Sequence, residues 1–288
     1  MKPDVTVSIV NWNTKDELFE CLKSLFAQEG VELEVFVVDN ASSDGSAGFV
    51  WDEYGPQVRL IENSANLGFG AAHNQVIRES NSRYVLLFNP DCRFLETDAL
   101  AKMVDYLDHN SDIGMLGPKI LNPDGTLQYS ARRFPNMVAA LFRHTIFGRL
   151  FPHNKFVREY LMTDWAHDQV TDIDWLSGAA LMIRRETIDR IGLLDERFFM
   201  YCEDVDWCRR AHSAGWGVVY FPMASVSHRI GAASDQNPVS MIRQHHRSML
   251  RYFLKYDGRS PRVLLTPFVL VGLWLRARSL IKRAKPRK

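Results

Sequence analysis

The sequence predicts an α/β fold in which a mostly parallel central sheet is flanked by helices. Short runs rich in valine and isoleucine alternate with segments of helical periodicity, and this alternation is typical of parallel strands joined by crossover helices. Two of the apolar runs lead into an aspartate, Asp39 and Asp91, at the place where parallel sheets commonly bind ligands. The 288 residues are enough for one large domain, or for one domain with an appendage.

Each predicted strand is an apolar segment bounded by turn residues or by a helical pattern. One segment is interrupted by the small residues Ser177, Gly178 and Ala179, and the last one ends shortly before His228. The predicted strands are 5–10, 34–38, 58–61, 84–88, 113–116, 173–183 and 218–221.

The predicted helices occupy the segments between these strands. Thr14 and Glu17 form a capping-box pattern, after which apolar residues recur at helical spacing as far as Gly30. A strong turn is expected at the sequence NPDG, residues 122–125, and irregular or mobile helices are expected over 132–169, where periodicity is weak. The other expected helices are a short one after residue 45, one from about 69 to 80, and those at 97–110, 204–213 and 241–256.

Composition excludes several classes of protein. The net charge of +1 provides no case for nucleic-acid binding by bulk electrostatics. The first residues lack the apolar region of a signal peptide. The cysteines form no CxxC pair, which argues against a zinc site and favours a reducing, cytosolic setting. They are Cys21, Cys92, Cys202 and Cys208.

Two features of the N-terminal half have both a functional and a structural interpretation. Asp39 ends a predicted strand, so its carboxylate could accept hydrogen bonds from a nucleotide base or ribose, or it could be an Asx-type turn residue that satisfies its own backbone. The loop 66–70 could bring backbone close to a phosphate at a helix N-terminus. This loop matches neither the GxGxxG nor the GxxxxGK[ST] pattern, and by itself it favours an ordinary glycine turn.

Asp91 has the chemistry of a metal ligand. It follows Asn89 and Pro90, and the proline is expected to end the strand because it cannot donate a ladder hydrogen bond. The carboxylate is then either a hard oxygen ligand for Mg²⁺ or Mn²⁺ on a diphosphate, or an ordinary turn aspartate. His228 is expected just after the last sheet strand, beside a loop that could close over a phosphate. A single histidine is more often a structural hydrogen-bonding residue than a ligand.

The acidic run at residues 203–206 opens a predicted helix, where acids stabilise the helix dipole by roughly 0.3–1 kcal/mol each. Helical spacing places Asp204 on the face of Trp207 and Cys208, while Asp206 shares the other face with arginines. We therefore expect Asp206 to form a surface ion pair. Asp204 is expected in apolar surroundings, which raise the proton affinity of a carboxylate and suit a general base.

The C-terminal tail combines an apolar segment with a basic end. Residues 263–275 are apolar but contain Pro267 and Gly272, and thirteen residues are too few to span a bilayer comfortably. From Arg276 onward every charged residue is basic. We favour an interfacial anchor on an anionic membrane, and the alternative is a core-packing helix with a solvated basic end.

Taken together, these motifs resemble the family 2 glycosyltransferases with the GT-A fold. The resemblance covers about residues 4–235, and the sequences WLSGA at 175–179 and FFMY at 198–201 are similar to those of bacterial rhamnosyltransferases. The motifs that establish the order along the chain are VSIVN at 7–11, VVDNAS at 37–42, NLGF at 66–69, NPD at 89–91 and EDVDW at 203–207.

The resemblance implies an inverting transfer of a sugar from a nucleotide diphosphate to an alcohol. Asp204 would be the catalytic base, with Glu203 and Trp207 supporting the acceptor. Asp91 and His228 would hold a divalent metal, Mg²⁺ or Mn²⁺, because Asn89 replaces the first acid of the family's DxD motif. The implied donor-binding residues are Asn11, Asp39, Asn66, Gly68, Asn74, Asn89 and Trp175.

The same resemblance implies a GT-A domain over 1–235, with a nucleotide-sugar half at about 1–120 and an acceptor half at 121–235, and a helical extension over 236–288. The best match for the donor is dTDP-L-rhamnose, and the acceptor would be a saccharide or lipid-linked saccharide of cell-surface polysaccharide synthesis such as O-antigen. The enzyme would be cytoplasmic, peripheral on the inner face of the cytoplasmic membrane, and would not bind nucleic acid.

Three alternatives remain at this stage. The donor could be a UDP- or GDP-hexose or galactofuranose. The chain could be a non-catalytic carbohydrate-binding relative, against which the joint presence of Asp91, Asp204 and His228 argues. A nucleotidyltransferase is disfavoured, because the loop after the first strand has neither the glycine nor the arginine that such enzymes usually have there.

Overall fold

A nine-stranded sheet forms the centre of the computed structural model, which describes residues 2–135 and 154–284. The strand order is β3-β2-β1-β4-β10-β6-β11-β5, with β8 paired to β11, and a separate ribbon joins β7 to β9. The strands are β1 Val5–Asn11, β2 Leu33–Asp39, β3 Val58–Glu62, β4 Tyr84–Phe88, β5 Cys92–Phe94, β6 Ile113–Leu121, β7 Ala131–Arg132, β8 Thr171–Asp172, β9 Trp175–Leu176, β10 Ala180–Arg184 and β11 Gly217–His228.

The chain reverses its direction of travel across the sheet between β1 and β4. Strands β1, β2 and β3 are parallel neighbours, after which the chain returns to place β4 on the other side of β1. β10 is antiparallel to both β4 and β6, and β11 is parallel to β6. The carboxyl ends of β1, β2, β4, β6 and β11 therefore lie at one edge of the sheet, which we call the carboxyl edge. In open α/β sheets, ligands bind at this edge beside such a reversal.

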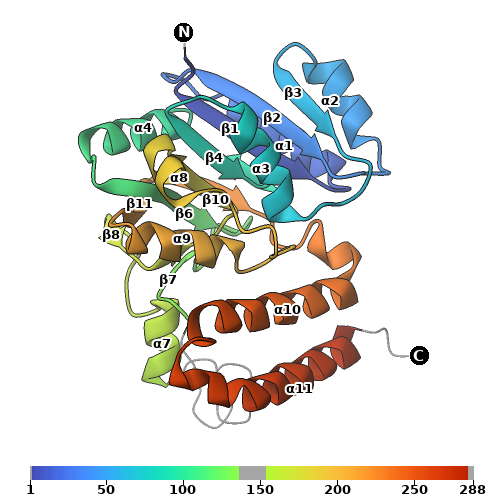
Figure 1. Ribbon diagram of the computed structural model, residues 1–288. Coiled ribbons are helices and arrows are strands. Elements are labelled where there is room, and N and C mark those ends of the chain that lie inside the picture. The colour runs from blue at the N-terminus through green and yellow to red at the C-terminus, as the bar shows by residue number, and fades with distance from the viewer. Residues whose placement is uncertain (1, 136–153, 285–288) are drawn as a thin grey trace.

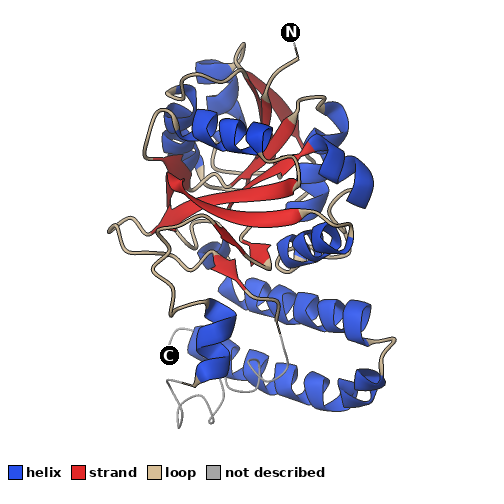
Figure 2. Ribbon diagram, turned by 90° about the vertical axis from the view of Figure 1, so that its left-hand side faces the viewer, coloured by secondary structure: helices blue, strands red, loops and turns tan. Residues whose placement is uncertain are grey.

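Helices cover both faces of the sheet, as Figure 2 shows. Leu22 of α1 and Met103 of α4 pack with Val7 and Leu86 in one core, whereas Ile188 of α8 and Val205 of α9 pack in another core with Val85 and Leu87. Burial on both faces explains why the central strands are almost continuously apolar. The covering helices are α1 Lys15–Phe26, α2 Ser46–Tyr54, α3 Phe69–Glu79, α4 Ala99–His109, α8 Arg185–Ile191 and α9 Glu203–Ser213.

The C-terminal helices form a pair below the sheet domain (Figure 1). The 20-residue helix α10 contacts the sheet domain, where the Ser248 hydroxyl donates to the carbonyl of Met200 at 2.8 Å. Helix α11 packs along α10 and has no buried residue. The remaining elements are α7 Lys155–Leu161, η1 Ser234–Gln236, α10 Pro238–Asp257, η2 Pro261–Leu265 and α11 Thr266–Ala284.

The predicted α/β class is confirmed, and several boundaries differ. β11 continues to His228, so this histidine ends the strand instead of following it. The predicted strand 173–183 is two strands, β9 and β10, separated by the small residues 177–179. The expected turn at 122–125 is present, with the Gly125 amide donating to the Asn122 carbonyl at 2.9 Å. Within 132–169, α7 is a regular helix, and residues 136–153 lie outside the described part of the chain.

The expectation that the apolar C-terminal segment is too short to span a bilayer was wrong. The helical stretch runs over Pro261–Ala284, 24 residues, and its most apolar 18-residue segment has a mean hydropathy of 1.5, so the helix is long and apolar enough to cross a membrane by length and composition. Pro267 does not end the helix because it lies in the first turn of α11, where backbone N–H groups lack intrahelical partners in any case.

Candidate active site

The strand register brings the predicted site residues to the carboxyl edge. Asn11 is paired with Asp39, and Ile9 of the same strand is paired with Phe88, so Asn89 to Asp91 lie level with the end of β1. His228 is paired with Cys92, the residue next to Asp91. The start of β10 meets the same edge, since Ala180 is paired with Phe88.

The ends of β1 and β2 carry a closed hydrogen-bond network. The Asn11 amide donates to Asp39 Oδ2 and to the Ser42 hydroxyl, both at 3.2 Å, and its Oδ1 accepts from Thr14 at 2.7 Å. Asp39 Oδ1 accepts from the Ser42 backbone N–H at 2.8 Å, which is the Asx-type turn considered from the sequence. Asn11 and Asp39 are both buried. This network fixes the loop that follows β2.

Position 68 requires a glycine because the backbone of Phe199 lies directly against it. Its φ of +86° favours glycine, and a side chain there would collide with the carbonyl oxygen of Phe199. The next backbone N–H, that of Phe69, donates to the same carbonyl at 2.8 Å. Asn66 shapes this turn by accepting from the Gly68 N–H at 2.9 Å. The glycine turn therefore joins α3 to the segment that precedes α9.

Asn74 does not line a pocket, and this correction concerns one of the predicted donor-binding residues. Its fully buried amide accepts from the Leu194 N–H at 3.0 Å and donates to the Leu194 carbonyl and to Glu196, each at 2.9 Å. Both amide atoms are thus engaged with the segment before α9. Asn74 holds this segment against α3.

Asp91 and His228 lie side by side near the ends of β4 and β11. Asp91 Oδ1 lies 3.2 Å from His228 Nε2, but it is buried and makes no hydrogen bond among the described residues. The Asn89 amide nitrogen lies 3.5 Å from the same Nε2. A buried carboxylate oxygen without a hydrogen bond is costly, and a cation is the natural partner for a carboxylate and an imidazole nitrogen side by side.

Cys92 lies within reach of the same point, because one ligand atom each of Asp91, Cys92 and His228 falls within 4.8 Å of the others. Its thiol is buried and lies 3.3 Å from the Ala179 carbonyl, to which it donates. Burial, and then the charge of Asp91, raises the pKa of the Cys92 thiol well above its usual value. Since metals bind the thiolate form, the donor set that fits a divalent cation is Asp91 with His228.

Asp204 opens helix α9 and is held by two backbone groups. Its Oδ2 accepts from the Gly178 N–H at 3.0 Å, and its Oδ1 accepts from the Val205 N–H at 2.8 Å. Burial raises the pKa of this carboxyl above its usual value, while those two hydrogen bonds and the charge of Arg132 act in the opposite direction. A carboxylate with raised proton affinity can accept a proton from an alcohol more readily than an exposed one.

The two acidic groups are linked by consecutive residues before β10. Gly178 donates to Asp204, and the carbonyl of Ala179 accepts from the Asn89 N–H at 2.8 Å. Backbone groups of two consecutive residues thus connect α9 with the residue two positions before Asp91. The two acidic clusters are thus attached to the same short segment of the chain.

Glu203 and Asp206, the other acids of the run, are buried. Burial, and then the charge of Asp204, raises the pKa of Glu203 well above its usual value, and its Oε2 has no hydrogen-bond partner among the described residues. Asp206 was expected to form a surface ion pair, which is wrong. It is paired internally with Arg210 at 2.9 Å and with Lys255 of α10 at 2.5 Å.

Of the two tryptophans predicted to shape the pocket, Trp207 does not do so. Trp207 is fully buried and donates its Nε1–H to the Gly192 carbonyl at 2.9 Å, so it belongs to the core behind α9 and cannot contact an acceptor. Trp175 of β9 is mostly buried, and its Nε1–H donates to the Arg133 carbonyl at 2.8 Å. The Arg132 guanidinium lies 5.2 Å from the Trp175 ring centre, and its charge acts to lower the pKa of Asp204.

Comparison with known proteins decides the family. The sequence model of the glycosyltransferase-like family 2 matches residues 3–250. The chain belongs to this family. It is 31% identical to the N-acetylglucosaminyl-diphospho-decaprenol L-rhamnosyltransferase of Mycobacterium tuberculosis, over 98% of this chain and 95% of that relative. It is 25% identical to rhamnosyltransferase WbbL of Escherichia coli K12, over 65% and 70% of the two chains.

Solved glycosyltransferases share the fold of this family 2 transferase. The mannosyltransferase PcManGT of Pyrobaculum calidifontis, solved with GDP-Man and Mn²⁺, matches with a TM-score of 0.58 at 19% identity, over 99% of this chain and 75% of that one. GalNAc-T7, solved with UDP, GalNAc and Mn²⁺, matches with a TM-score of 0.61 at 14% identity, over 94% and 54%. The GT-A fold class predicted from the sequence is confirmed.

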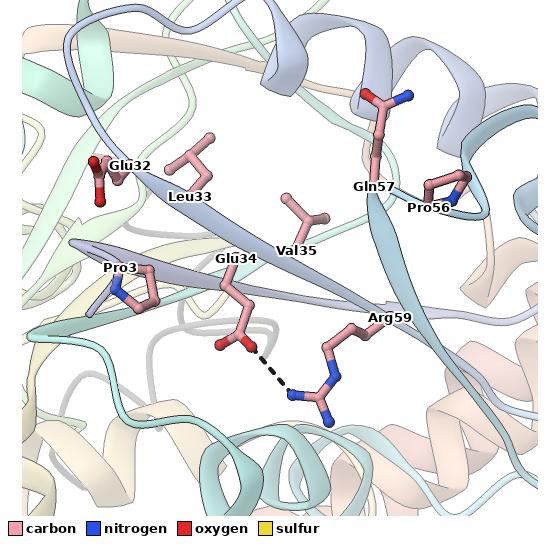
Figure 3. Close-up of a pocket in the computed structure, with 8 residues that line it drawn as sticks. All are labelled: Pro3, Glu32, Leu33, Glu34, Val35, Pro56, Gln57 and Arg59. Carbon is pink, nitrogen blue, oxygen red and sulfur yellow. Dashed lines mark hydrogen bonds and ion pairs between the residues drawn. The ribbon is translucent and has the colours of Figure 1, made fainter. Parts of the chain in front are cut away.

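One surface cleft of the described part of the transferase is lined by none of these groups (Figure 3). Its volume is about 550 Å³, and the side chains around it come from the start of β1 and from β2 and β3, where Glu34 pairs with Arg59 at 3.1 Å. The cleft sits at the amino ends of parallel strands. We assign the site to the carboxyl edge, because chemistry in such sheets is found there and because the unpaired carboxylate lies there.

Three residues of the transferase's site were not singled out from the sequence. Gly178 holds Asp204, Arg132 lies beside Trp175, and Gln128 contacts His228. The turn at 122–125 was a usable signal for Gln128, because a tight turn after a central strand returns the chain to that strand's end. No local pattern distinguishes Gly178 or Arg132 from ordinary loop residues.

Proposed function

We propose that this transferase moves L-rhamnose from dTDP-L-rhamnose to a hydroxyl group of a prenyl-diphosphate-linked saccharide. The observation that supports this most is the 31% identity to the M. tuberculosis rhamnosyltransferase over nearly the full length of both chains. The E. coli relative, also a rhamnosyltransferase, supports the same donor sugar. The prenyl-diphosphate acceptor comes from the name of the mycobacterial relative alone.

Asp204 acts as the general base in this proposal. Its carboxylate takes the proton of the acceptor hydroxyl as that oxygen attacks the anomeric carbon of the donor. The new bond joins the acceptor oxygen to the anomeric carbon, and the bond between that carbon and the diphosphate oxygen breaks, so that dTDP leaves from the opposite face with inversion. Gly178 and Val205 keep the carboxylate oriented through their backbone N–H groups, and such a base contributes roughly 10²–10⁴ in rate.

Asp91 and His228 would hold a divalent cation, Mg²⁺ or Mn²⁺. The buried, unbonded Oδ1 of Asp91 beside His228 Nε2 fits this assignment. When bound, the cation neutralises charge that develops on the leaving diphosphate. The Asn89 amide lies close enough to assist in orienting the same diphosphate.

The remaining donor contacts are proposed at the ends of β1, β2 and β9. Asp39 keeps lone pairs beyond its two hydrogen bonds and is proposed to accept from the nucleotide, with Asn11 holding it in place. Asn66 and Gly68 shape the adjoining turn, and Trp175 borders the sugar. Glu203 is proposed as a support for Asp204, because its buried side chain stands next to the base on α9.

We further infer that the helices of residues 238–284 form a unit that rests on an anionic membrane surface. Several large apolar side chains of the α11 region are exposed, Leu264 at 78% and Phe268 at 75%, and Arg278 and Lys282 follow on the same helix. Helix α11 packs along α10, which carries four basic residues and one acid and is bound to the sheet domain. A helix so placed suits a position in the membrane plane better than a membrane crossing.

This placement suggests a cytoplasmic enzyme on the inner face of the membrane. Sedimentation of the full chain with vesicles containing anionic lipid tests it, compared with a variant that ends at Gly258. Loss of sedimentation in the shortened chain is expected, and unchanged sedimentation would remove the anchor from the proposal.

The proposed reaction is tested with the purified full chain, Mn²⁺ and synthetic prenyl-diphosphate N-acetylglucosamine. Parallel reactions contain dTDP-L-rhamnose, UDP-galactofuranose, a UDP-hexose or a GDP-hexose, and products are identified by mass spectrometry. We expect a mass increase of one deoxyhexose with the first donor only. Transfer from another donor would replace rhamnose in the proposal, and absence of both transfer and donor hydrolysis would favour a non-catalytic carbohydrate-binding relative.

A further inference from the structure

Gln128 contacts His228 at two points. Its side-chain Oε1 lies 3.0 Å from the imidazole Nδ1, and its side-chain Nε2 donates to the His228 backbone carbonyl at 2.6 Å. A single side chain therefore binds both the ring and the backbone of the same residue. No other described side chain contacts Nδ1 of His228 within hydrogen-bond distance.

The contact between Gln128 and the His228 carbonyl determines which ring nitrogen of His228 carries a proton. A carbonyl oxygen can only accept, so the nitrogen of the Gln128 amide must face it, and the amide oxygen must then face Nδ1. Because an amide oxygen is only an acceptor, Nδ1 must carry a proton. The neutral ring consequently presents an unprotonated Nε2 on its other side.

The lone pair of Nε2 then lies toward Asp91. Asp91 Oδ1, itself without a hydrogen bond, is 3.2 Å away, and the nearest other polar group is the Asn89 amide at 3.5 Å. Two acceptors at this distance repel one another unless a cation lies between or beside them. The Gln128 contacts thus orient His228 so that Nε2 can bind a cation that Asp91 Oδ1 also contacts.

The fold places Gln128 here by a tight turn. After β6 the chain turns at 122–125, with the Asn122 N–H donating to the Thr126 carbonyl at 2.7 Å, and the Gln128 N–H returns to the Ile120 carbonyl at 2.9 Å. Since β6 is paired in parallel with β11 up to Leu121 and Ser227, the residue that follows the turn arrives beside His228. The position of Gln128 is therefore held by these backbone hydrogen bonds.

We propose that Gln128 is a positioning residue that fixes the orientation and tautomer of His228, so that Nε2 is presented with Asp91 to a divalent cation. The inference rests on the metal-dependent transfer proposed above. It adds to that proposal a residue that contacts a metal ligand and does not contact the metal itself. Partners of this kind orient metal-binding histidines in many proteins, and their loss weakens metal affinity by about 10–100-fold.

The test compares Gln128→Met, which removes both polar atoms at similar volume, with Gln128→Glu, which keeps an acceptor for Nδ1–H. Gln57→Met serves as the control, because Gln57 is an exposed glutamine at the opposite edge of the sheet. Histidine ring ¹⁵N spectra of the metal-free full chain report the tautomer, and the His228 signals are assigned by their loss in His228→Asn. Binding of Mn²⁺ in the presence of dTDP or UDP is measured by electron paramagnetic resonance.

We expect the wild type and Gln128→Glu to show a protonated Nδ1 and an unprotonated Nε2, and Gln128→Met to lose this preference. Mn²⁺ affinity should fall by about 10–100-fold in Gln128→Met, and stay within a few-fold of wild type in Gln128→Glu and Gln57→Met.

The outcomes separate this inference from the proposed function. An unchanged tautomer and unchanged Mn²⁺ affinity in a folded Gln128→Met, with His228→Asn weakened, would overturn the role of Gln128 and leave the metal site standing. Unchanged Mn²⁺ affinity in His228→Asn would overturn both.

Discussion

The two ends of the carboxyl edge differ in how completely their polar groups are paired. At the ends of β1 and β2, Asn11, Asp39 and Ser42 bind one another. At the ends of β4 and β11, Asp91 Oδ1 has no hydrogen bond, although it is buried 3.2 Å from His228 Nε2. An unpaired buried acceptor costs about 1–3 kcal/mol. The comparison indicates that the first region maintains the shape of the site, and the second retains binding capacity for a ligand.

The largest expected effect belongs to Asp204, which is tied to the unpaired end through Gly178 and Ala179. Asp204→Asn keeps the shape of the side chain but cannot accept the acceptor's proton. Turnover should fall roughly 10²–10⁴-fold while donor affinity, measured by calorimetry, changes little. Asp189→Asn, an exposed acid on α8, is the control. Turnover of Asp204→Asn within about threefold of wild type would exclude the role of base.

Asp91→Asn tests the unpaired end directly. The substitution removes the charge of a carboxylate whose buried Oδ1 makes no hydrogen bond among the described residues, so the melting temperature should stay close to that of wild type. Metal-dependent donor binding should weaken by about 10–100-fold, as when a metal loses a ligand or its support. Calorimetry with and without Mn²⁺ measures this. Equal donor affinity for both proteins under both conditions would refute Asp91 as a ligand.

Asn11→Ala tests the paired end and should have the opposite profile. It leaves Asp39 Oδ2 and the Thr14 hydroxyl without their present partner, so unfolding free energy should drop by about 1–3 kcal/mol. Denaturant unfolding measures this, with the exposed Asn81→Ala as the control. If Asn11→Ala is as stable as wild type, the proposed distinction between the two ends does not hold.

The smallest expected effect concerns the pH dependence of turnover. Burial raises the pKa of Asp204, and the positive charge of Arg132 opposes this rise. A base works only when deprotonated, so kcat/KM should fall with decreasing pH around a pKa above that of an ordinary aspartate. Arg132→Met should move this acid limb to higher pH, whereas Arg93→Met, an exposed arginine, should leave it in place. A shift to lower pH in Arg132→Met would contradict the geometry.

The errors in the predicted site have a common cause. Asn74 and Trp207 lie on helical faces that a single sequence cannot orient, and their partners, Leu194 and Gly192, come from a segment with no pattern of its own. Asp206 was judged by its own helix, where Arg210 was correctly expected as a neighbour, but α10 covers it with Lys255. Gln128 was missed because its partner lies 100 positions away.

The sequence by itself determined the alternation of strands and helices, the strand-end positions of Asp39 and Asp91, and the helix-start position of Asp204. These follow from local periodicity, proline and capping chemistry, which act over a few residues. Only the tertiary structure decided which polar groups are satisfied. Hydrogen-bond partners such as Gly178 for Asp204 and Gln128 for His228 are joined by the sheet order, and that order depends on burial of apolar faces across the whole chain.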